Sequence, residues 1–221
     1  MGQGGTETWR RAIRAYLAAI SFCDTMVGRV LDAYDASPER DDTIICFWSD
    51  HGWHLGEKHH WRKFALWEET TRVPLIWVVP GLTPPDGRCD RTVDTMSIYP
   101  TLMELCGLPV PAHVQGISVA SLLANPGRPW DHPAISTFRQ GNHSVRSETH
   151  RYTRYADGGE ELYDEVADPY EWTNLAGSAA VDCGTRDRLT SSVPRQDAPP
   201  ADEPSAAGLP PAAAPPVGSG R

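Results

Sequence analysis

The segment that most constrains this chain is an apolar run followed directly by a dense polar loop. Residues 44–48 read IICFW, and residues 49–63 then read SDHGWHLGEKHHWRK. Bulky apolar residues in an unbroken run are typical of a strand that is buried on both faces. Asp50 and His51 would then lie where that strand ends. Ligands of open α/β sheets bind outside the carboxyl ends of the strands, so the pattern predicts a functional site in this loop.

The loop is locally cationic in an acidic chain. Four of the eight histidines lie between positions 51 and 60, and Lys58, Arg62 and Lys63 accompany them, whereas the formal net charge of the chain is -9. This local charge favours an anionic substrate. A solvated connection between two strands would have the same polarity, and two candidate ligands do not close a metal site. The residues alone therefore leave open a metal site, an anion site and a plain surface loop.

The same segment resembles the sulfatase family, and most of all its iduronate-2-sulfatase branch. The shared pattern is carried by Ser49 to Glu57, Trp61-Arg62-Lys63, Arg72-Val73-Pro74-Leu75-Ile76 and Pro80-Gly81. The match is long and keeps its order, so chance is a poor explanation. The resemblance implies an α/β fold of the alkaline-phosphatase-like class and the hydrolysis of a sulfate ester.

The resemblance also implies roles for individual residues. Asp50 and His51 would be two ligands of a divalent cation, usually calcium, and Lys63 would contact the sulfate of the substrate. A carboxylate suits a hard cation, whereas softer metals accept an imidazole more readily, so the sequence predicts metal binding more firmly than calcium. A lysine ammonium can neutralise charge that builds on a sulfate oxygen. The remaining histidines of the loop have no family role and are expected to be loop residues: His54, His59 and His60.

One departure from the family pattern concerns the nucleophile. Sulfatases use a cysteine that is oxidised to formylglycine within a Cys-x-Pro-x-Arg or similar motif. This motif surrounds none of the five cysteines, which are Cys23, Cys46, Cys89, Cys106 and Cys183. The paired aspartates that supply the family's other metal ligands are also missing from the sequence. We therefore expect the chain to correspond to the C-terminal half of a sulfatase, beginning in the helix before the Asp-His strand.

The composition of the chain limits the classes of partner that it is expected to bind. Hydrophobic residues make up 40% of the chain and charged residues 22%, which is typical of a globular protein, and the acidic balance argues against a nucleic-acid groove or an anionic membrane surface. The five cysteines have no paired zinc spacing and suggest no disulfide framework. No signal-peptide pattern opens the sequence and no apolar stretch reaches membrane-spanning length. The compartment stays open, because an absent N-terminal half would carry any export signal.

The sequence divides into three segments. Periodicity in the first, residues 1–128, predicts a helix over residues 9–34, strands at 43–48 and 73–79, and a helix closed by Gly107. The resemblance implies that this segment is the C-terminal part of the sulfatase α/β domain. Alternation of strand, helix and strand indicates a parallel sheet flanked by helices.

The second and third segments differ in character from the first. In residues 129–177, two short strands flank the turn Asp157-Gly158-Gly159 and predict a hairpin. The resemblance implies that this hairpin belongs to a small antiparallel C-terminal subdomain. Residues 178–221 are rich in proline and alanine and are expected to be disordered, with a docking segment for a partner as the alternative.

The sequence thus predicts a metal-dependent sulfuric ester hydrolase whose substrate is a sulfated small molecule or a sulfated sugar. Two rival interpretations stay open. A phosphate-ester or phosphonate-ester hydrolase of the same superfamily could share Asp50 and His51, and a non-catalytic remnant or one half of a split protein would also show this sequence. In the split arrangement, the partner is the N-terminal half as a separate chain.

Overall fold

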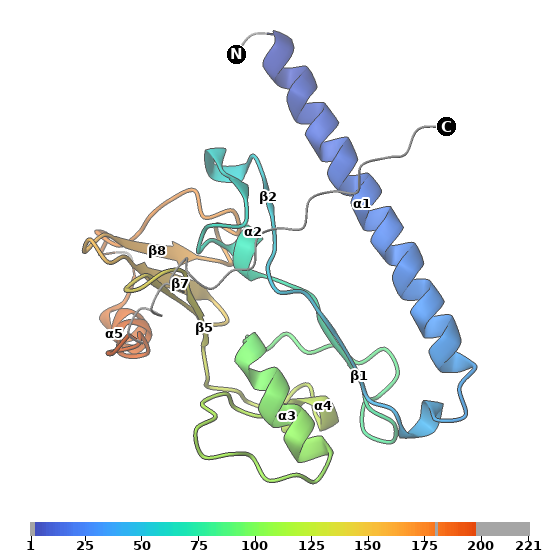
Figure 1. Cartoon of the computed structure of the whole chain (residues 1–221). Helices are drawn as coiled ribbons and strands as arrows, with labels where there is room; N and C mark the ends of the chain where they lie inside the picture. The colour runs from blue at the N-terminus through green and yellow to red at the C-terminus, as the bar shows by residue number, and fades with distance from the viewer. Residues whose placement is uncertain (1–2, 180, 198–221) are drawn as a thin grey trace, which may run out of the picture.

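The computed structural model describes residues 3–179 and 181–197 of the 221-residue chain (Figure 1). Its first element is a long helix, α1 (Gln3–Asp35), which stands beside the rest of the molecule. The helix ends before Ser37-Pro38, as the periodicity predicts. No residue between 5 and 50 is buried, so α1 rests on the rest of the described chain through partial contacts only.

A two-stranded ribbon, β1 (Ile45–Trp48) and β4 (Leu75–Val78), runs along α1. Both strands lie where the sequence predicts them, but they pair antiparallel, with Trp48 opposite Leu75 and Ile45 opposite Val78. The parallel pairing expected from the sequence is wrong for these two strands. The connection leaves β1 and enters β4 at the same end of the ribbon, whereas parallel neighbours need a crossover to the opposite end.

The expectation that this strand is buried on both faces is also wrong within the described chain. Phe47 and Trp48 are 38% and 47% exposed, and the strand's other two residues are only partly buried. An open groove of about 360 Å³ runs between α1 and β1, lined by Cys23, Met26, Val27, Val30, Leu31, Ile45, Cys46 and Phe47. The apolar character of β1 therefore faces a groove and solvent here.

The connection between β1 and β4 contains the segment of interest. It forms a short hairpin of β2 (His54–Leu55) and β3 (Trp61–Arg62), with His54 opposite Arg62, and then the one-turn helix α2 (Glu68–Thr71). A second group of helices follows β4, made of α3 (Ile98–Leu105) and α4 (Ala120–Ala124). The α3 helix ends at Gly107, which has a φ of 67°, as the sequence predicts. Single 3-10 turns complete this half of the chain at Arg40–Asp42, Glu57–His59 and Thr95–Ser97.

The C-terminal part is a four-stranded antiparallel sheet in the order β5-β6-β7-β8. Its strands are β5 (Ala134–Thr137), β6 (His143–Arg146), β7 (His150–Arg154) and β8 (Glu160–Asp164). The turn between β7 and β8 contains Gly158 at a φ of 88°, which confirms the predicted hairpin. The register places Val145, Tyr152 and Leu162 side by side on one face.

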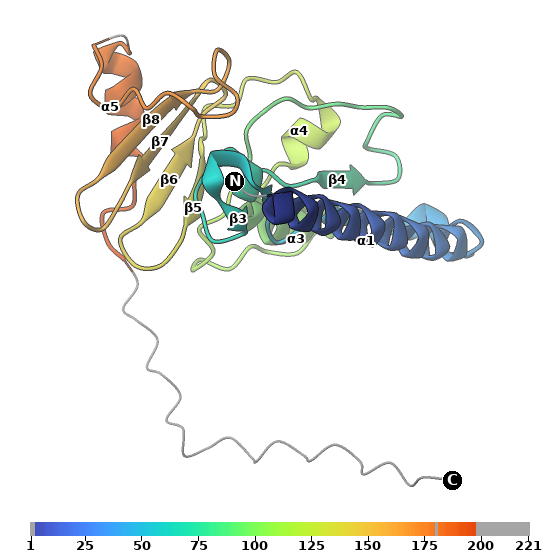
Figure 2. The same cartoon turned by 90° about the horizontal axis from the view of Figure 1, so that it is seen from above.

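A helix that the sequence did not predict covers that face (Figures 1 and 2). It is α5 (Cys183–Ser191), and its Leu189 packs with Val181 and Val193 on the sheet as one core cluster. The predicted start of disorder at residue 178 is therefore wrong, because residues 181–197 are folded onto the sheet. Apolar residues are sparse in this stretch, but each is placed on the side that meets the sheet. Residues 198–221 of the predicted tail lie outside the described residues.

No helix in the described part of the chain is both long and apolar enough to cross a bilayer.

Candidate functional site

Asp50 and His51 lie at the end of β1, where the sequence predicts them. The Asp50 Oδ2 atom is 3.4 Å from His51 Nε2, and the Asp50 side chain is largely exposed. His51 Nδ1 lies 2.9 Å from the carbonyl oxygen of Gly52. Because a carbonyl only accepts hydrogen bonds, Nδ1 carries the proton in this contact. In its neutral form, a His51 ring with this proton on Nδ1 would present the lone pair of Nε2 beside the Asp50 carboxylate.

This donor pair fits a cation but does not complete its shell. Two neighbouring ligands at right angles around a cation at about 2.4 Å would be about 3.4 Å apart, which matches the separation of Asp50 Oδ2 and His51 Nε2. Calcium takes about six to eight ligands. The described residues contain no cluster of three or more His, Cys, Asp or Glu side chains suited to a metal ion. Asp50 and His51 could therefore hold a cation only together with ligands from elsewhere.

Gly52 fixes the direction of the chain after His51. Its amide donates to the Thr70 carbonyl at 2.7 Å, and the Trp53 amide donates to the Glu69 carbonyl at 2.7 Å. A Cβ atom on residue 52 would lie 2.1 Å from the Glu69 oxygen, so only glycine allows this approach. The Asp-His pair is thereby tied to α2.

Aromatic side chains connect the same loop to α1. Trp53 stacks on Tyr16 with ring centroids 5.8 Å apart, and the Trp9 indole donates to the Leu55 carbonyl at 2.7 Å. These contacts have no direct signal in the sequence, although the spacing of Trp9 and Tyr16 places both residues on one helix face.

Lys63 follows β3 directly and is half-buried. Its ammonium lies 5.8 Å from the Phe64 ring, and it has no hydrogen-bond or ion-pair partner in the part of the chain that the structure describes. No hydrogen bond or ion pair joins this ammonium to Asp50 or His51 within the described residues. A half-buried ammonium without a partner is able to receive an anion.

The other loop histidines, which the sequence predicts to be loop residues and not ligands, differ in their burial. His59 is exposed. His54 is fully buried, with its ring 5.0 Å from that of His60, and both pack against Trp67. Burial, aided by the neighbouring His60, lowers the pKa of His54. These two rings belong to the packing beneath the hairpin.

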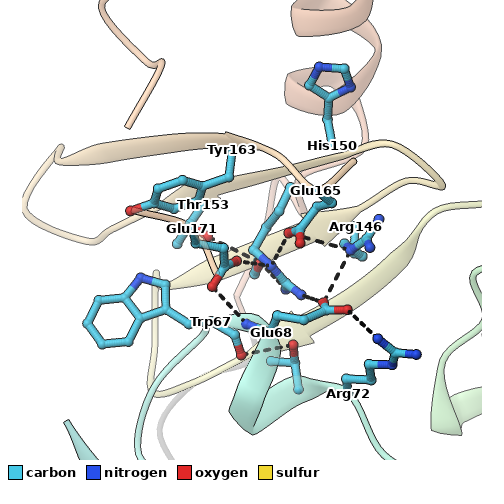
Figure 3. Close-up of polar contacts among 12 residues, drawn as sticks. Trp67, Glu68, Arg72, Arg146, His150, Thr153, Tyr163, Glu165 and Glu171 are labelled. Atoms are coloured by element: carbon cyan, nitrogen blue, oxygen red, sulfur yellow. Dashed lines mark hydrogen bonds and ion pairs between the residues drawn. The ribbon is translucent and has the colours of Figure 1, made fainter. Parts of the chain in front are cut away.

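Below the hairpin, a buried ionic network joins α2 to the C-terminal sheet (Figure 3). The fully buried Arg151 of β7 pairs with Glu165 at 3.1 Å and Glu171 at 2.7 Å, and also with Glu68 of α2. Arg146 adds a second cation, 3.2 Å from Glu68. The Glu171 carboxylate accepts a hydrogen bond from the Glu68 amide at 2.9 Å.

The pKa values of the carboxylates in this network shift in opposite directions. Burial alone would raise the pKa of Glu68, but Arg151 and Arg146 together hold it below its usual value. Burial raises the pKa of Glu171 to about 7 in spite of Arg151. Burial likewise raises the pKa of Glu165. With three carboxylates around two arginines, Glu171 is thus partly protonated near pH 7.

The sequence did not predict this network, because a charged residue in a strand is normally expected to face the solvent. The one usable signal is alternation. In β7, Tyr152 faces the apolar cluster with α5, so Arg151 and Thr153 must face the other side of the sheet. That other side meets α2 and the residues just before it, as the ion pair of Arg151 with Glu68 and its hydrogen bond to the Leu66 carbonyl at 3.2 Å show.

Comparison with family models matches two regions of the chain. The model described as sulfatase matches residues 2–108, and the model described as the C-terminal part of N-sulphoglucosamine sulphohydrolase matches residues 56–193. The second match includes α5, in agreement with its packing on the sheet.

Curated relatives and solved structures agree with these matches. A sulfatase of Formosa agariphila is 45% identical over 170 residues, which are 77% of this chain and 33% of the relative. The iduronate 2-sulfatase of Mus musculus is 40% identical over 130 residues, covering 48% of this chain and 24% of that protein. A solved structure in complex with its substrate, D-glucosamine-2-N,6-O-disulfate, superposes with a TM-score of 0.74 at 26% identity, over 86% of this chain and 41% of that one.

The chain spans about a third of the length of the Formosa relative. The expected fold class, α/β of the alkaline-phosphatase-like type with a small antiparallel C-terminal subdomain, is confirmed by the solved structures and the β5–β8 sheet. Both the matched models and the relatives therefore lead to one conclusion: this chain belongs to the sulfatase family, the family of sulfuric ester hydrolases.

Proposed function

We propose that this chain supplies the cation-binding and sulfate-contacting residues of a sulfatase that acts on sulfated sugars. The observation that carries the proposal is the pairing of Asp50 Oδ2 and His51 Nε2 at 3.4 Å, at the end of β1. Lys63, whose ammonium has no polar partner among the described residues, follows on the same connection between β1 and β4. This arrangement supports the role for Lys63 that the family resemblance implies.

Each residue would contribute in its own way to the hydrolysis of a sulfate ester. Attack on sulfur releases the sugar hydroxyl, and negative charge builds on the sulfate oxygens and on the leaving oxygen. The Lys63 ammonium would stabilise that charge more strongly in the transition state than in the bound substrate. Asp50 and His51 would hold a divalent cation, for which we propose calcium, and this cation adds positive charge beside the sulfate.

The nucleophile has to come from outside the 221 residues. None of the five cysteines stands in a formylglycine motif, so we derive no covalent step within this chain. We propose that a further part of the fold, which carries this motif and the other metal ligands, packs against this region. The exposed apolar side chains along α1 and β1 support this, since Phe22 is 68% and Trp48 47% exposed. Large apolar side chains gathered on one face are typical of an interface.

A sulfated sugar is the substrate class that we favour. One structural neighbour was solved with D-glucosamine-2-N,6-O-disulfate, and this supports the choice by similarity. The cationic Lys63 and Arg62 suit an anionic substrate in general.

The decisive experiment is complementation. The purified chain is mixed with a polypeptide that contains the N-terminal part of the Formosa relative, with its motif cysteine converted to formylglycine. We expect hydrolysis of an aryl sulfate and of the glucosamine disulfate by the mixture and by neither component alone. Addition of a calcium chelator should abolish it. Faster cleavage of an aryl phosphate or phosphonate ester would instead favour the rival hydrolase, and an inactive mixture that nevertheless forms a complex would favour a non-catalytic remnant.

The Lys63 assignment has its own test in the same mixture. Lys63→Ala should lower kcat by about 100-fold or more, because a charge placed against the developing negative charge is lost. Calcium binding by the complex, measured by calorimetry, should stay within about twofold, since the ammonium is not a ligand. Activity equal to the parent would remove Lys63 from the site.

A further inference from the structure

The sequence contains two lysines, Lys58 and Lys63, five positions apart in the site hairpin. Their environments are opposite. The Lys63 ammonium has no polar partner in the described chain, whereas the Lys58 ammonium is enclosed on several sides. Lys58 Nζ donates to the Tyr163 hydroxyl at 3.1 Å and to the Glu171 carbonyl. It also lies 4.4 Å from the Tyr163 ring centre and 4.8 Å from that of Trp67.

This enclosure is a good one for a cation. Two aromatic faces attract an ammonium, and a hydroxyl and a carbonyl accept two of its three protons. Burial raises the pKa of Tyr163, so its hydroxyl stays protonated and meets Lys58 as a neutral oxygen. The contact joins residues 105 and 113 positions apart in the sequence, and it therefore holds the hairpin tip to the C-terminal sheet.

The backbone at both ends of the contact is in the left-handed region. Lys58 has a φ of 51° and His59 a φ of 58°, and Glu171 has a φ of 56°. Residues other than glycine keep this conformation only where their surroundings enforce it. The hydrogen bond from the Lys58 ammonium to the Glu171 carbonyl helps to hold this conformation, because it links one left-handed segment to the other.

Glu171 is also the point where the two ends of the proposed site meet. Its carboxylate accepts from the Glu68 amide and so holds α2, which in turn receives the amide of Gly52, next to His51. Its carbonyl accepts from Lys58, which precedes β3 and Lys63. One residue of the C-terminal sheet region thus fixes the cation-binding end through α2 and the lysine end through Lys58.

We propose that Lys58 is a positioning residue, which ties the tip of the hairpin to the Glu171 carbonyl and thereby sets where Lys63 lies relative to Asp50 and His51. The inference rests on the proposed function in treating Lys63 as the sulfate contact. The anchoring itself does not depend on that role and is measurable in the chain alone.

The test uses the full chain grown with lysine that carries ¹³C at the ε position, so that NMR shows one side-chain signal for each lysine. We expect the Lys58 signal to be displaced upfield by the Trp67 and Tyr163 rings and the Lys63 signal to lie near that of free lysine. Lys58→Met should move the Lys63 signal and accelerate hydrogen exchange at the amides of residues 61–63 by about tenfold. Lys58→Arg should restore both readouts toward the parent, since a guanidinium also binds aromatic faces.

Controls separate anchoring from general stability. Arg188→Met on α5 removes a cation far from the hairpin and should leave the Lys63 signal and the three amides unchanged. If Lys58→Met fails to fold, Tyr163→Phe, which keeps the ring and removes the hydroxyl, should still shift the Lys58 signal and speed exchange at residues 61–63. An undisplaced Lys58 signal, or a Lys58→Met chain with unchanged Lys63 signal and exchange, overturns the proposal.

A sulfate titration distinguishes this proposal from the proposed function. Sulfate should move the Lys63 signal of the parent chain, with an affinity about tenfold weaker in Lys58→Met. If sulfate moves neither lysine while the anchoring readouts hold, the sulfate role of Lys63 fails and the anchor stands. If sulfate moves Lys63 equally in parent and Lys58→Met, Lys58 does not position it.

Discussion

The C-terminal sheet and the α1–β1–β4 region use apolar side chains in opposite ways. In the sheet, Val145 and Leu162 are at most 1% exposed, because α5 covers the face on which they lie. Along α1 and β1, Phe22 and Trp48 remain 68% and 47% exposed. The first region closes its core from elements of this chain, and the second offers an apolar face that nothing in the described residues covers.

This difference shows that hydrophobic patterning and burial are separate properties of a sequence. The run at residues 44–48 is more apolar than any strand of the C-terminal sheet. Its side chains are nevertheless less buried than those of the sheet. Burial depends on which elements are available to pack. The chain spans a third of its Formosa relative, and the region without a cover is the one that matches the sulfatase model at residues 2–108.

The largest expected effect tests whether α5 completes the sheet. Removing residues 179–197 from a chain that ends at Asp197 should lower the free energy of unfolding by about 5 kcal/mol or more, since it strips Val181, Leu189 and Val193 from the core. Urea unfolding followed by circular dichroism measures the loss. Equal midpoints for the two chains would mean that the sheet is stable without α5.

The next test removes the central cation from the charged face of the same sheet. Arg151→Met should cost about 3–5 kcal/mol, because it leaves the carboxylates of Glu68, Glu165 and Glu171 without their central cation. Arg72→Met is the matched control, since Arg72 is 77% exposed and 3.9 Å from Glu68, and it should change stability by less than about 0.5 kcal/mol. Similar losses for both variants in the same urea experiment would contradict a special role for the buried network.

A pair of truncations compares the two regions directly. Leu189→Ala on α5 should destabilise the chain by about 2–5 kcal/mol. Phe22→Ala on α1 removes a larger side chain but should cost less than about 0.5 kcal/mol, as expected for an exposed position. Thermal melts of both variants would measure the two losses of stability. A substantial loss for Phe22→Ala would mean that α1 packs more tightly than its exposure indicates.

The smallest effect is the dependence of stability on pH. The pKa of Glu171 is raised from 4.5 to about 7 on folding, so the folded state binds the proton more tightly than the unfolded state. Its contribution to stability is complete below about pH 4.5 and is lost as the pH rises to about 7, a change on the order of 1–3 kcal/mol. Glu171→Gln should flatten the profile of unfolding free energy between pH 5 and 7. An unchanged slope would assign the dependence to other groups.

The sequence predicted the elements better than their pairing. The strands at β1 and β4, the helix α3 with its terminal Gly107, and the β7–β8 hairpin all lie at the predicted positions. These elements have strong local signals, such as apolar runs and turn glycines. The antiparallel pairing of β1 with β4 has none, because 26 residues between them are long enough for either direction.

Two features of the site region were beyond sequence reasoning for a physical reason. Arg151 is buried only because three carboxylates from distant segments converge on it, and no local pattern announces that convergence. The α5 helix has Leu189 as its one large apolar residue, so its apolar face shows only after the sheet is in place. Asp50, His51 and Lys63 were found because the family pattern fixes their spacing, and their roles stay predictions.

The groove between α1 and β1 also has a practical consequence. Cys23 and Cys46 both line it, whereas Cys89, Cys106 and Cys183 are exposed elsewhere, and all five thiols are free. Burial raises the pKa of Cys46, so this thiol should react more slowly with alkylating reagents than the exposed ones. Labelling at Cys23 and Cys46 would stop when another polypeptide fills the groove, while the three remaining thiols serve as an internal reference. The reactivity of these two cysteines would therefore report whether the groove is filled.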